Sequence, residues 1–186
     1  YKCRTAEILE NVRSCKSEVG VLYLDDFNRE VLEKLLADSG LEFTELFPCH
    51  TYVFLAAGHP LAERPLITLE DLAPYPCLSF DQGQSFYLAE EVYSTYHYRQ
   101  VIKASDRATL LNLMVGLDGY TLCSGILCEE LNGDGYRAVP LDSDKIMHIG
   151  YVKRQGCVLS PLAKIYLEEL DRCNVNVLDH PAGLAR

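Results

Sequence analysis

The chain has 186 residues, of which 48% are hydrophobic, so it can bury a sizeable core in one domain or in two small lobes. Its 17 Lys and Arg residues against 27 Asp and Glu residues give a net charge of −10, which repels the phosphate backbone of DNA. No run of about 18 apolar residues exists, and the first residues read as an amphipathic helix rather than an apolar signal core. We therefore expect a globular, cytoplasmic protein that contacts neither membrane nor DNA by itself.

The eight cysteines are scattered along the chain and lie mostly within apolar runs. They form no Cys-x-x-Cys pair, and no Cys/His cluster has the spacing of a zinc site. We expect reduced thiols that fill space as small apolar side chains, with no metal and no cofactor.

The first 57 residues alternate short helices with apolar strands. Thr5 can cap a helix whose apolar residues recur every three or four positions, and Asn28 can cap a second helix, which Gly40 is placed to end. The strands expected here are residues 19–24, 41–47 and 52–57. This alternation predicts an α/β fold with a parallel-rich sheet.

Residues 58–76 predict a stiff connection out of this first lobe. Prolines bias His59 and Arg64 toward extended geometry, and Thr68 with Asp71 three positions later predicts one short capped helical turn. His59 has no serine, cysteine or carboxylate at a diagnostic spacing, so packing in this connection is favoured over catalysis.

A second α/β lobe follows. Its expected strands are residues 77–80, 101–104, 120–123 and 136–139. Its expected helices are residues 86–96, a helix capped by Ser105 or Asp106 and ended by Gly119, and a short helix from Ser124-Gly125 to Leu131.

Residues 146–153 then predict a strand that returns to the first lobe, and Ser160-Pro161 opens a last helix to about residue 173. The expected organisation is a first lobe of residues 1–57 and 146–173, a second lobe of residues 58–145, and a loosely held tail of residues 174–186.

The order and spacing of several segments carry a family resemblance. They are the triplet His59-Pro60-Leu61, the segment Thr68–Leu72, residues 115–127 with the sequence VGLDGYTLCSGIL, and the helix start Ser160-Pro161-Leu162. Together they resemble the effector-binding domain of LysR-type transcriptional regulators. The resemblance implies a type 2 periplasmic-binding-protein-like fold, with two Rossmann-like lobes joined by two crossover strands.

The resemblance also implies a function without catalysis. A small-molecule effector would bind between the lobes, and a separate N-terminal domain would bind DNA. The domain would form a homodimer, with a homotetramer for a full-length regulator. The family's winged helix-turn-helix, its linker helix and the first strand-helix-strand of its domain have no counterpart before Thr5, so we expect a fragment or a differently completed domain.

Ligands of open α/β sheets bind beyond the carboxyl ends of strands, and the resemblance points to the same turns. The turn 81–85 is the most informative, because Gly83 allows close approach of the backbone and a helix start there favours an anionic ligand. The predicted ligand-binding residues are Tyr23, Asp81, Gln82, Gln84, Ser85, Phe86, Arg107, Thr109 and Ser124. The alternative is that Ser85 and Asp106 are only caps, that Gln82 and Gln84 are solvated, and that Arg107 forms a surface salt bridge.

Three further possibilities stay open. The family includes peroxide-sensing members that act through a disulfide, but Cys123 and Cys128 have no adjacent cation, so structural cysteines are favoured. A free solute-binding protein for transport would share the two-lobed design. A small enzyme on the same architecture is the third possibility, although no nucleophile, metal or cofactor constellation supports it.

Overall fold

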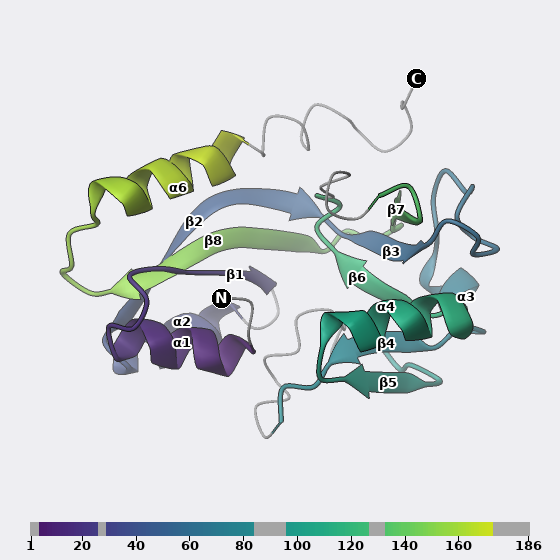
Figure 1. Cartoon of the computed structure of the whole chain (residues 1–186), viewed down its shortest axis with the longest axis horizontal. Coiled ribbons are helices and arrows are strands. Elements are labelled where there is room, and N and C mark those ends of the chain that lie inside the picture. The colour runs from purple at the N-terminus through teal and green to yellow at the C-terminus, as the bar shows by residue number, and fades with distance from the viewer. Residues whose placement is uncertain (1–3, 26–28, 84–95, 127–132, 173–186) are drawn as a thin grey trace. The chain divides into compact units, whose positions relative to one another are not determined.

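A computed structural model of the chain describes residues 4–25, 29–83, 96–126 and 133–172 (Figure 1). These residues group into two compact units. The first unit holds the described residues up to Cys49 and from Lys145 onward, and the second unit holds those from His50 to Asp144. None of the described helices has the length and apolar character needed to cross a bilayer.

The first unit is built on a three-stranded sheet. Its strands, in spatial order, are β1 (Gly20–Asp25), β8 (Ile146–Arg154) and β2 (Leu41–His50). Its helices are α1 (Thr5–Arg13), α2 (Arg29–Asp38) and α6 (Pro161–Arg172). β1 runs antiparallel to β8, with Gly20 opposite Val152.

Glycines allow close packing around this sheet. A Cβ at Gly20 would come within 2.3 Å of the Ile8 side chain, so α1 lies directly on β1. A Cβ at Gly150 would come within 2.4 Å of the Thr44 carbonyl oxygen, which belongs to the backbone of β2. Both contacts require glycine because nothing larger fits between these elements.

Local signals set the helix ends of the first unit. Gly40 adopts φ +70° and ends α2, and the Ser160 hydroxyl accepts the Ala163 N–H at 3.2 Å at the start of α6, as predicted. The prediction for Thr5 is wrong, because Arg4 is the N-cap of α1. The Glu7 carboxylate accepts the Arg4 N–H at 3.3 Å, while Thr5 is buried. Asn28 lies outside the described residues.

The second unit is built on a five-stranded mixed sheet. Its strands, in spatial order, are β5 (Val101–Ala104), β4 (Cys77–Phe80), β6 (Tyr120–Cys123), β3 (Tyr52–Ala56) and β7 (Tyr136–Pro140). Its described helices are α3 (Leu69–Leu72) and α4 (Arg107–Gly116), which runs along β4 and β5 in Figure 1. The helices expected at 86–96 and beyond Ser124 fall largely on residues 84–95 and 127–132, which are outside the described part.

Strand directions correct two expectations. β4 is parallel to β5 and β6, but β1 is antiparallel to β8, and β3 is antiparallel to β6 and β7, so the sheets are mixed rather than parallel-rich. The antiparallel strands β3 and β8 are those that follow the passage of the chain from one unit to the other. Pairing of β3 with β6 and β7 also puts residues 52–56 in the second unit, although they were expected in the first lobe.

The end of α4 is a further correction. Gly119 was expected to end this helix, but the helix ends at Gly116, and Asp118 takes the left-handed position with φ +49°. The Gly119 N–H then donates to the Met114 carbonyl oxygen at 3.2 Å. Gly119 is needed for space instead, because a Cβ there would lie 2.8 Å from the Leu78 side chain.

In the crossover segment, residues 58–76, the side chain of His59 makes hydrogen bonds to the protein backbone. The His59 Nδ1 atom accepts the Leu61 N–H at 3.0 Å, so Nε2 carries the proton and donates to the Asp118 carbonyl oxygen at 3.0 Å. The ring also packs on Tyr75, with 4.4 Å between centroids, and burial lowers the pKa of His59. The prediction that His59 packs in this connection is confirmed.

The predicted capping of α3 is also confirmed. The Thr68 hydroxyl accepts the Asp71 N–H at 3.2 Å, and the Asp71 carboxylate accepts the Thr68 N–H at 3.0 Å. Leu72, at the end of this short helix, is fully buried in the core of the second unit. The cap thereby fixes the turn that delivers Leu72 to the core.

Candidate functional site

Three turns meet at one edge of the second unit's sheet. β4 is parallel to β5 and to β6, so the carboxyl ends of the three strands lie on the same side. Phe80 lies opposite Ala104, and the Asp81 N–H donates to the Ala104 carbonyl oxygen at 2.9 Å. We call residues 81–83, 105–109 and 124–126 the carboxyl edge. Such edges are where α/β folds bind small ligands.

The start of α4 is capped at this edge. The Asp106 carboxylate accepts the Thr109 N–H at 2.9 Å and the Thr109 hydroxyl at 2.7 Å. These hydrogen bonds, led by that from the backbone N–H, lower the pKa of Asp106. The carboxylate therefore offsets part of the positive end of the helix dipole, and the Thr109 hydroxyl proton is already donated.

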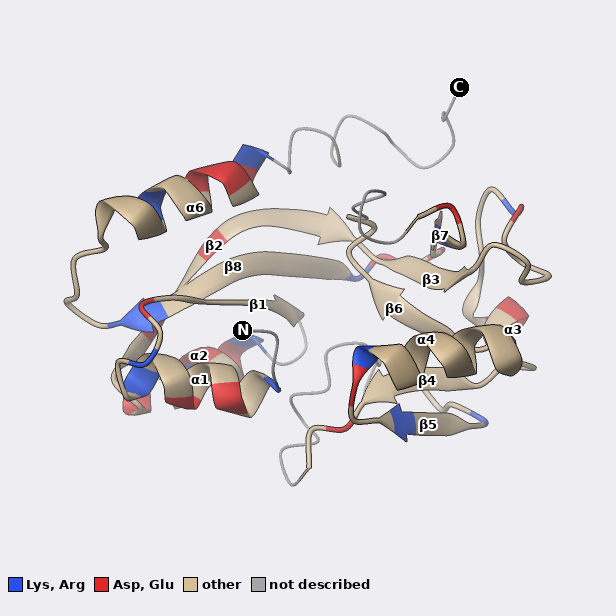
Figure 2. Cartoon of the chain, in the orientation of Figure 1, with Lys and Arg blue, Asp and Glu red and all other residues tan. Residues whose placement is uncertain are grey.

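Arg107 adds a positive group beside this cap. It lies in the first turn of α4, and its side chain is exposed. Figure 2 shows acidic residues in red next to basic residues in blue where the chain passes from β5 to α4. A guanidinium presents a planar fork of donors that matches a carboxylate or phosphate group, so Arg107 can bind an oxyanion despite the neighbouring carboxylate.

The turn after β4 is tightly folded. The Asp81 Oδ1 atom accepts the Gly83 N–H at 3.0 Å, and Gly83 adopts φ +62°. Gln82 is only 8% exposed, which argues against a solvated loop residue at this position. Gln84, Ser85 and Phe86 were predicted to bind ligand as well, but they lie outside the described residues.

The turn after β6 places Ser124 and Cys123 at the same edge. Gly125 adopts φ +75°, donates its N–H to the Cys123 sulfur at 3.4 Å, and leaves no room for a Cβ, which would lie 2.6 Å from the Tyr52 ring. Burial raises the pKa of the Cys123 thiol to about 11. This thiol is therefore protonated and unreactive at neutral pH, whereas Cys128 lies outside the described residues.

The structure gathers one group of the predicted ligand-binding residues. The members at the carboxyl edge are Asp81, Gln82, Arg107, Thr109 and Ser124. Tyr23 lies in β1 of the first unit and is half-buried. The hydrogen bonds from Thr109 to Asp106 were not predicted. An Asp three residues before a Thr at a helix start could have indicated them.

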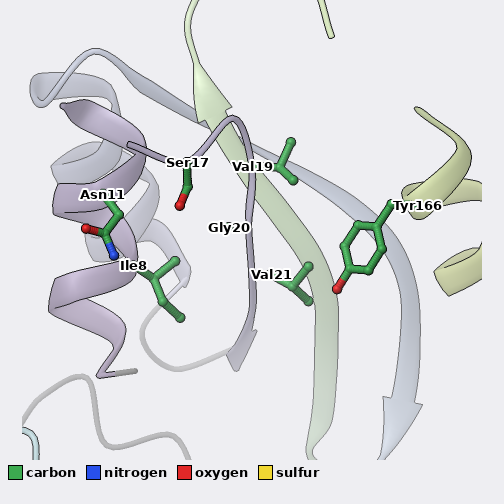
Figure 3. Close-up of a pocket in the computed structure, with 7 residues that line it drawn as sticks. All are labelled: Ile8, Asn11, Ser17, Val19, Gly20, Val21 and Tyr166. Atoms are coloured by element: carbon green, nitrogen blue, oxygen red, sulfur yellow. The ribbon is translucent and has the colours of Figure 1, made fainter. Parts of the chain in front are cut away.

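A pocket that the sequence did not predict lies in the first unit. Its volume is about 250 Å³, and it is lined by Ile8 and Asn11 of α1, by Ser17 and residues 19–21, and by Tyr166 of α6. Figure 3 shows α1 on one side of β1 and the Tyr166 ring approaching from the other. The lining holds no charged side chain. Among the described residues, no group of three or more His, Cys, Asp or Glu side chains is arranged to hold a metal ion.

These features define a class: an α/β ligand-binding domain of the type 2 periplasmic-binding-protein-like fold. The chain belongs to the LysR substrate binding domain family, whose model matches residues 4–173. No curated protein sequence matches the chain.

Solved structures share the fold at low sequence identity. HinK, a LysR family transcriptional regulator from Pseudomonas aeruginosa, is 16% identical with a TM-score of 0.62, and the match covers 92% of this chain and 58% of HinK. The reduced OxyR regulatory domain from the same organism is 14% identical with a TM-score of 0.61, covering 100% and 81%. The effector binding domain of QuiR in complex with shikimate is 14% identical with a TM-score of 0.57, covering 97% and 81%.

Proposed function

We propose that this chain is the ligand-sensing domain of a LysR-type transcription regulator. A small anionic metabolite binds at the carboxyl edge and changes how a dimer presents DNA-binding domains. The observation that carries the proposal is the meeting of three strand-end turns at the carboxyl edge of a domain in this family. The net charge of −10 supports DNA contact through another part of the regulator.

The side chains of the carboxyl edge favour a particular ligand chemistry. Arg107 can pair with one oxyanion, and Gln82 and Ser124 can add hydrogen bonds. Asp81 and Asp106 repel a second negative charge but can accept hydrogen bonds from hydroxyl groups. This combination favours a hydroxylated monocarboxylate over a dianion. Because QuiR's domain is described with shikimate, shikimate is a reasonable first probe.

Signalling requires that the ligand distinguish two arrangements of the protein. A ligand shifts such an equilibrium only through its different affinities for the two states, typically by about 1–3 kcal/mol. We propose Tyr23, in β1 of the first unit, as a further ligand-binding residue. The Tyr23→Phe variant should then bind ligand more weakly without change at the carboxyl edge.

The chemistry at the carboxyl edge supports binding rather than catalysis. The Cys123 thiol, with a pKa of about 11, is a poor nucleophile at neutral pH. The Thr109 hydroxyl donates its proton to the Asp106 carboxylate. Because the pKa of Asp106 is lowered, this carboxylate is a weak general base.

The experiment is a thermal-shift screen against hydroxylated carboxylates, amino acids and sulfur compounds, beginning with shikimate. Ligand at 100 times its dissociation constant stabilises the folded state by about 2.7 kcal/mol. The Arg107→Gln variant should weaken binding by roughly 10- to 100-fold, since a hydrogen bond to a charged group contributes about 1.5–3 kcal/mol.

The control is Arg99→Gln, because Arg99 is also exposed in the second unit but precedes β5 and so lies at the opposite end of that strand. This variant should bind like the parent. Equal affinity of the Arg107→Gln variant and the parent would place the ligand elsewhere.

A further inference from the structure

Two turns of the first unit lie against each other beyond the ends of β1 and β8. The antiparallel pairing ends with Gly20 opposite Val152. The segment before Gly20 therefore runs beside the segment after Val152. The Glu18 carboxylate accepts both the N–H and the hydroxyl of Ser160, which confirms that the two segments meet.

One arginine bridges two thiols in this region. The Arg154 Nη1 atom donates to the Cys15 sulfur at 2.7 Å, while Nε and Nη2 donate to the Cys157 sulfur at 3.4 and 3.2 Å. Hydrogen bonding to Cys157, followed by the charge of Cys15, raises the pKa of Arg154. The guanidinium group thus holds the two sulfur atoms beside each other.

Both thiols are held by the backbone around them. Cys15 adopts φ +61°, which is uncommon for a residue with a Cβ, and its N–H donates to the Val12 carbonyl oxygen at 3.2 Å. The Cys157 N–H donates to the Arg154 carbonyl oxygen at 3.2 Å across a turn, and Lys153 Nζ donates to the Cys157 carbonyl oxygen at 3.1 Å.

Exposure and contact with a cation together distinguish this pair from the other described cysteines. Cys15 is exposed and Cys157 is partly exposed, whereas Cys49 and Cys77 are buried in the cores. Cys123 is partly exposed, but its sulfur receives a backbone N–H and no cation. An oxidant in solution can therefore reach Cys15, and the thiol that could resolve its oxidation product contacts the same guanidinium.

We propose that Cys15 and Cys157 form a disulfide in response to hydrogen peroxide, with Arg154 as the residue that positions the two thiols. The disulfide would tie the end of α1 to the turn between β8 and α6 within the first unit. This inference is independent of the ligand binding proposed at the carboxyl edge, which belongs to the second unit.

The chemistry needs only the peroxide as oxidant. The Cys15 thiolate attacks one peroxide oxygen, so that an S–O bond forms, the O–O bond breaks, and the departing hydroxide takes a proton to become water. The Cys157 thiolate then attacks the Cys15 sulfur, so that the S–S bond forms, the S–O bond breaks, and the departing hydroxide takes a proton to become the second water. Two thiols are oxidised and one peroxide is reduced to two waters.

The test uses the intact protein, fully reduced and then treated with one equivalent of hydrogen peroxide before alkylation and trypsin digestion. The expected product is a linked pair of the peptides Ser14–Lys16 and Gln155–Lys164, lighter by two hydrogens than their sum. It should form at least about tenfold faster than any product of Cys49, Cys77 or Cys123, because Cys49 and Cys77 are buried and the pKa of Cys123 is raised.

Variants separate a built site from chance proximity. Cys157→Ser should leave a sulfenic acid on Cys15 that dimedone traps. Arg154→Gln should slow the reaction by at least about threefold, and Arg154→Lys should restore part of the rate. The proposal is overturned if Cys15 stays reduced, if it links to Cys15 of a second molecule instead, or if Arg154→Gln reacts as fast as the parent. Melting curves of the reduced variants check that each one folds.

Discussion

The crossover segment and the carboxyl edge use the same chemical device in two different places. In the crossover segment, Asp71 accepts the N–H and the hydroxyl of Thr68, each at 3.0 Å, and also pairs with Arg64. At the carboxyl edge, Asp106 accepts the N–H and the hydroxyl of Thr109. Both carboxyl groups have a lowered pKa because a backbone N–H donates to them.

The difference between the two regions lies in what surrounds each cap. The cap of α3 opens a single turn that delivers Leu72 into the core, while His59 is fixed by backbone hydrogen bonds nearby. The cap of α4 stands at the ends of three strands, next to an exposed Arg107. The Asp–Thr pair therefore has a structural role in both places, and position in the sheet decides which region can also bind a ligand.

The largest expected effect concerns the crossover segment. Leu72→Ala should destabilise the protein by about 2–5 kcal/mol, because a fully buried leucine is replaced by a cavity. Urea unfolding measures the change. Leu66→Ala, in the same segment but 41% exposed, should cost at most about 1 kcal/mol. Equal losses for the two variants would mean that α3 does not anchor this segment.

A smaller effect, common to the two caps, concerns the dependence of stability on pH. A carboxyl group whose pKa is lowered by folding contributes stability above its unfolded pKa of about 3.9, and this contribution is lost as the pH falls through the lower folded value. Asp71→Asn and Asp106→Asn should each flatten the dependence of the urea midpoint on pH below about 4.

A bound anion should then distinguish the caps. Negative charge near Asp106 favours the protonated carboxyl and raises its pKa, whereas Asp71 is expected to titrate as before. Carboxyl carbon chemical shifts, followed by NMR with and without ligand, measure both groups. Equal shifts at Asp71 and Asp106 would contradict the assignment of the ligand to the carboxyl edge.

Local chemistry made much of the fold predictable from sequence. The end of α2 at Gly40, the cap of α3 by Thr68 and Asp71, and the start of α6 at Ser160 depend on residues close in the chain. The antiparallel partners of β3 and β8 depend on distant segments, so periodicity within each strand could not give their direction.

The sequence predicted which turns form the candidate site, but not which of their side chains are already hydrogen-bonded. Strand order put Asp81, Arg107 and Ser124 at one edge. The Thr109 hydroxyl donates to Asp106, which was not predicted from the sequence although the three-residue spacing at a helix start could have indicated it. The contact of Arg154 with Cys15 joins residues 139 apart in the chain, so no local pattern could have indicated it, whereas Cys157 lies only three residues after Arg154.

The central claim is that ligand binds at the carboxyl edge, and amide hydrogen exchange tests it most directly. With a ligand from the screen at saturation, residues 81–83, 105–109 and 124–126 should exchange more slowly, while the crossover segment at 58–76 keeps its rates. Protection confined to the crossover segment, or to the pocket at Ile8 and Tyr166 in the first unit, would contradict the account.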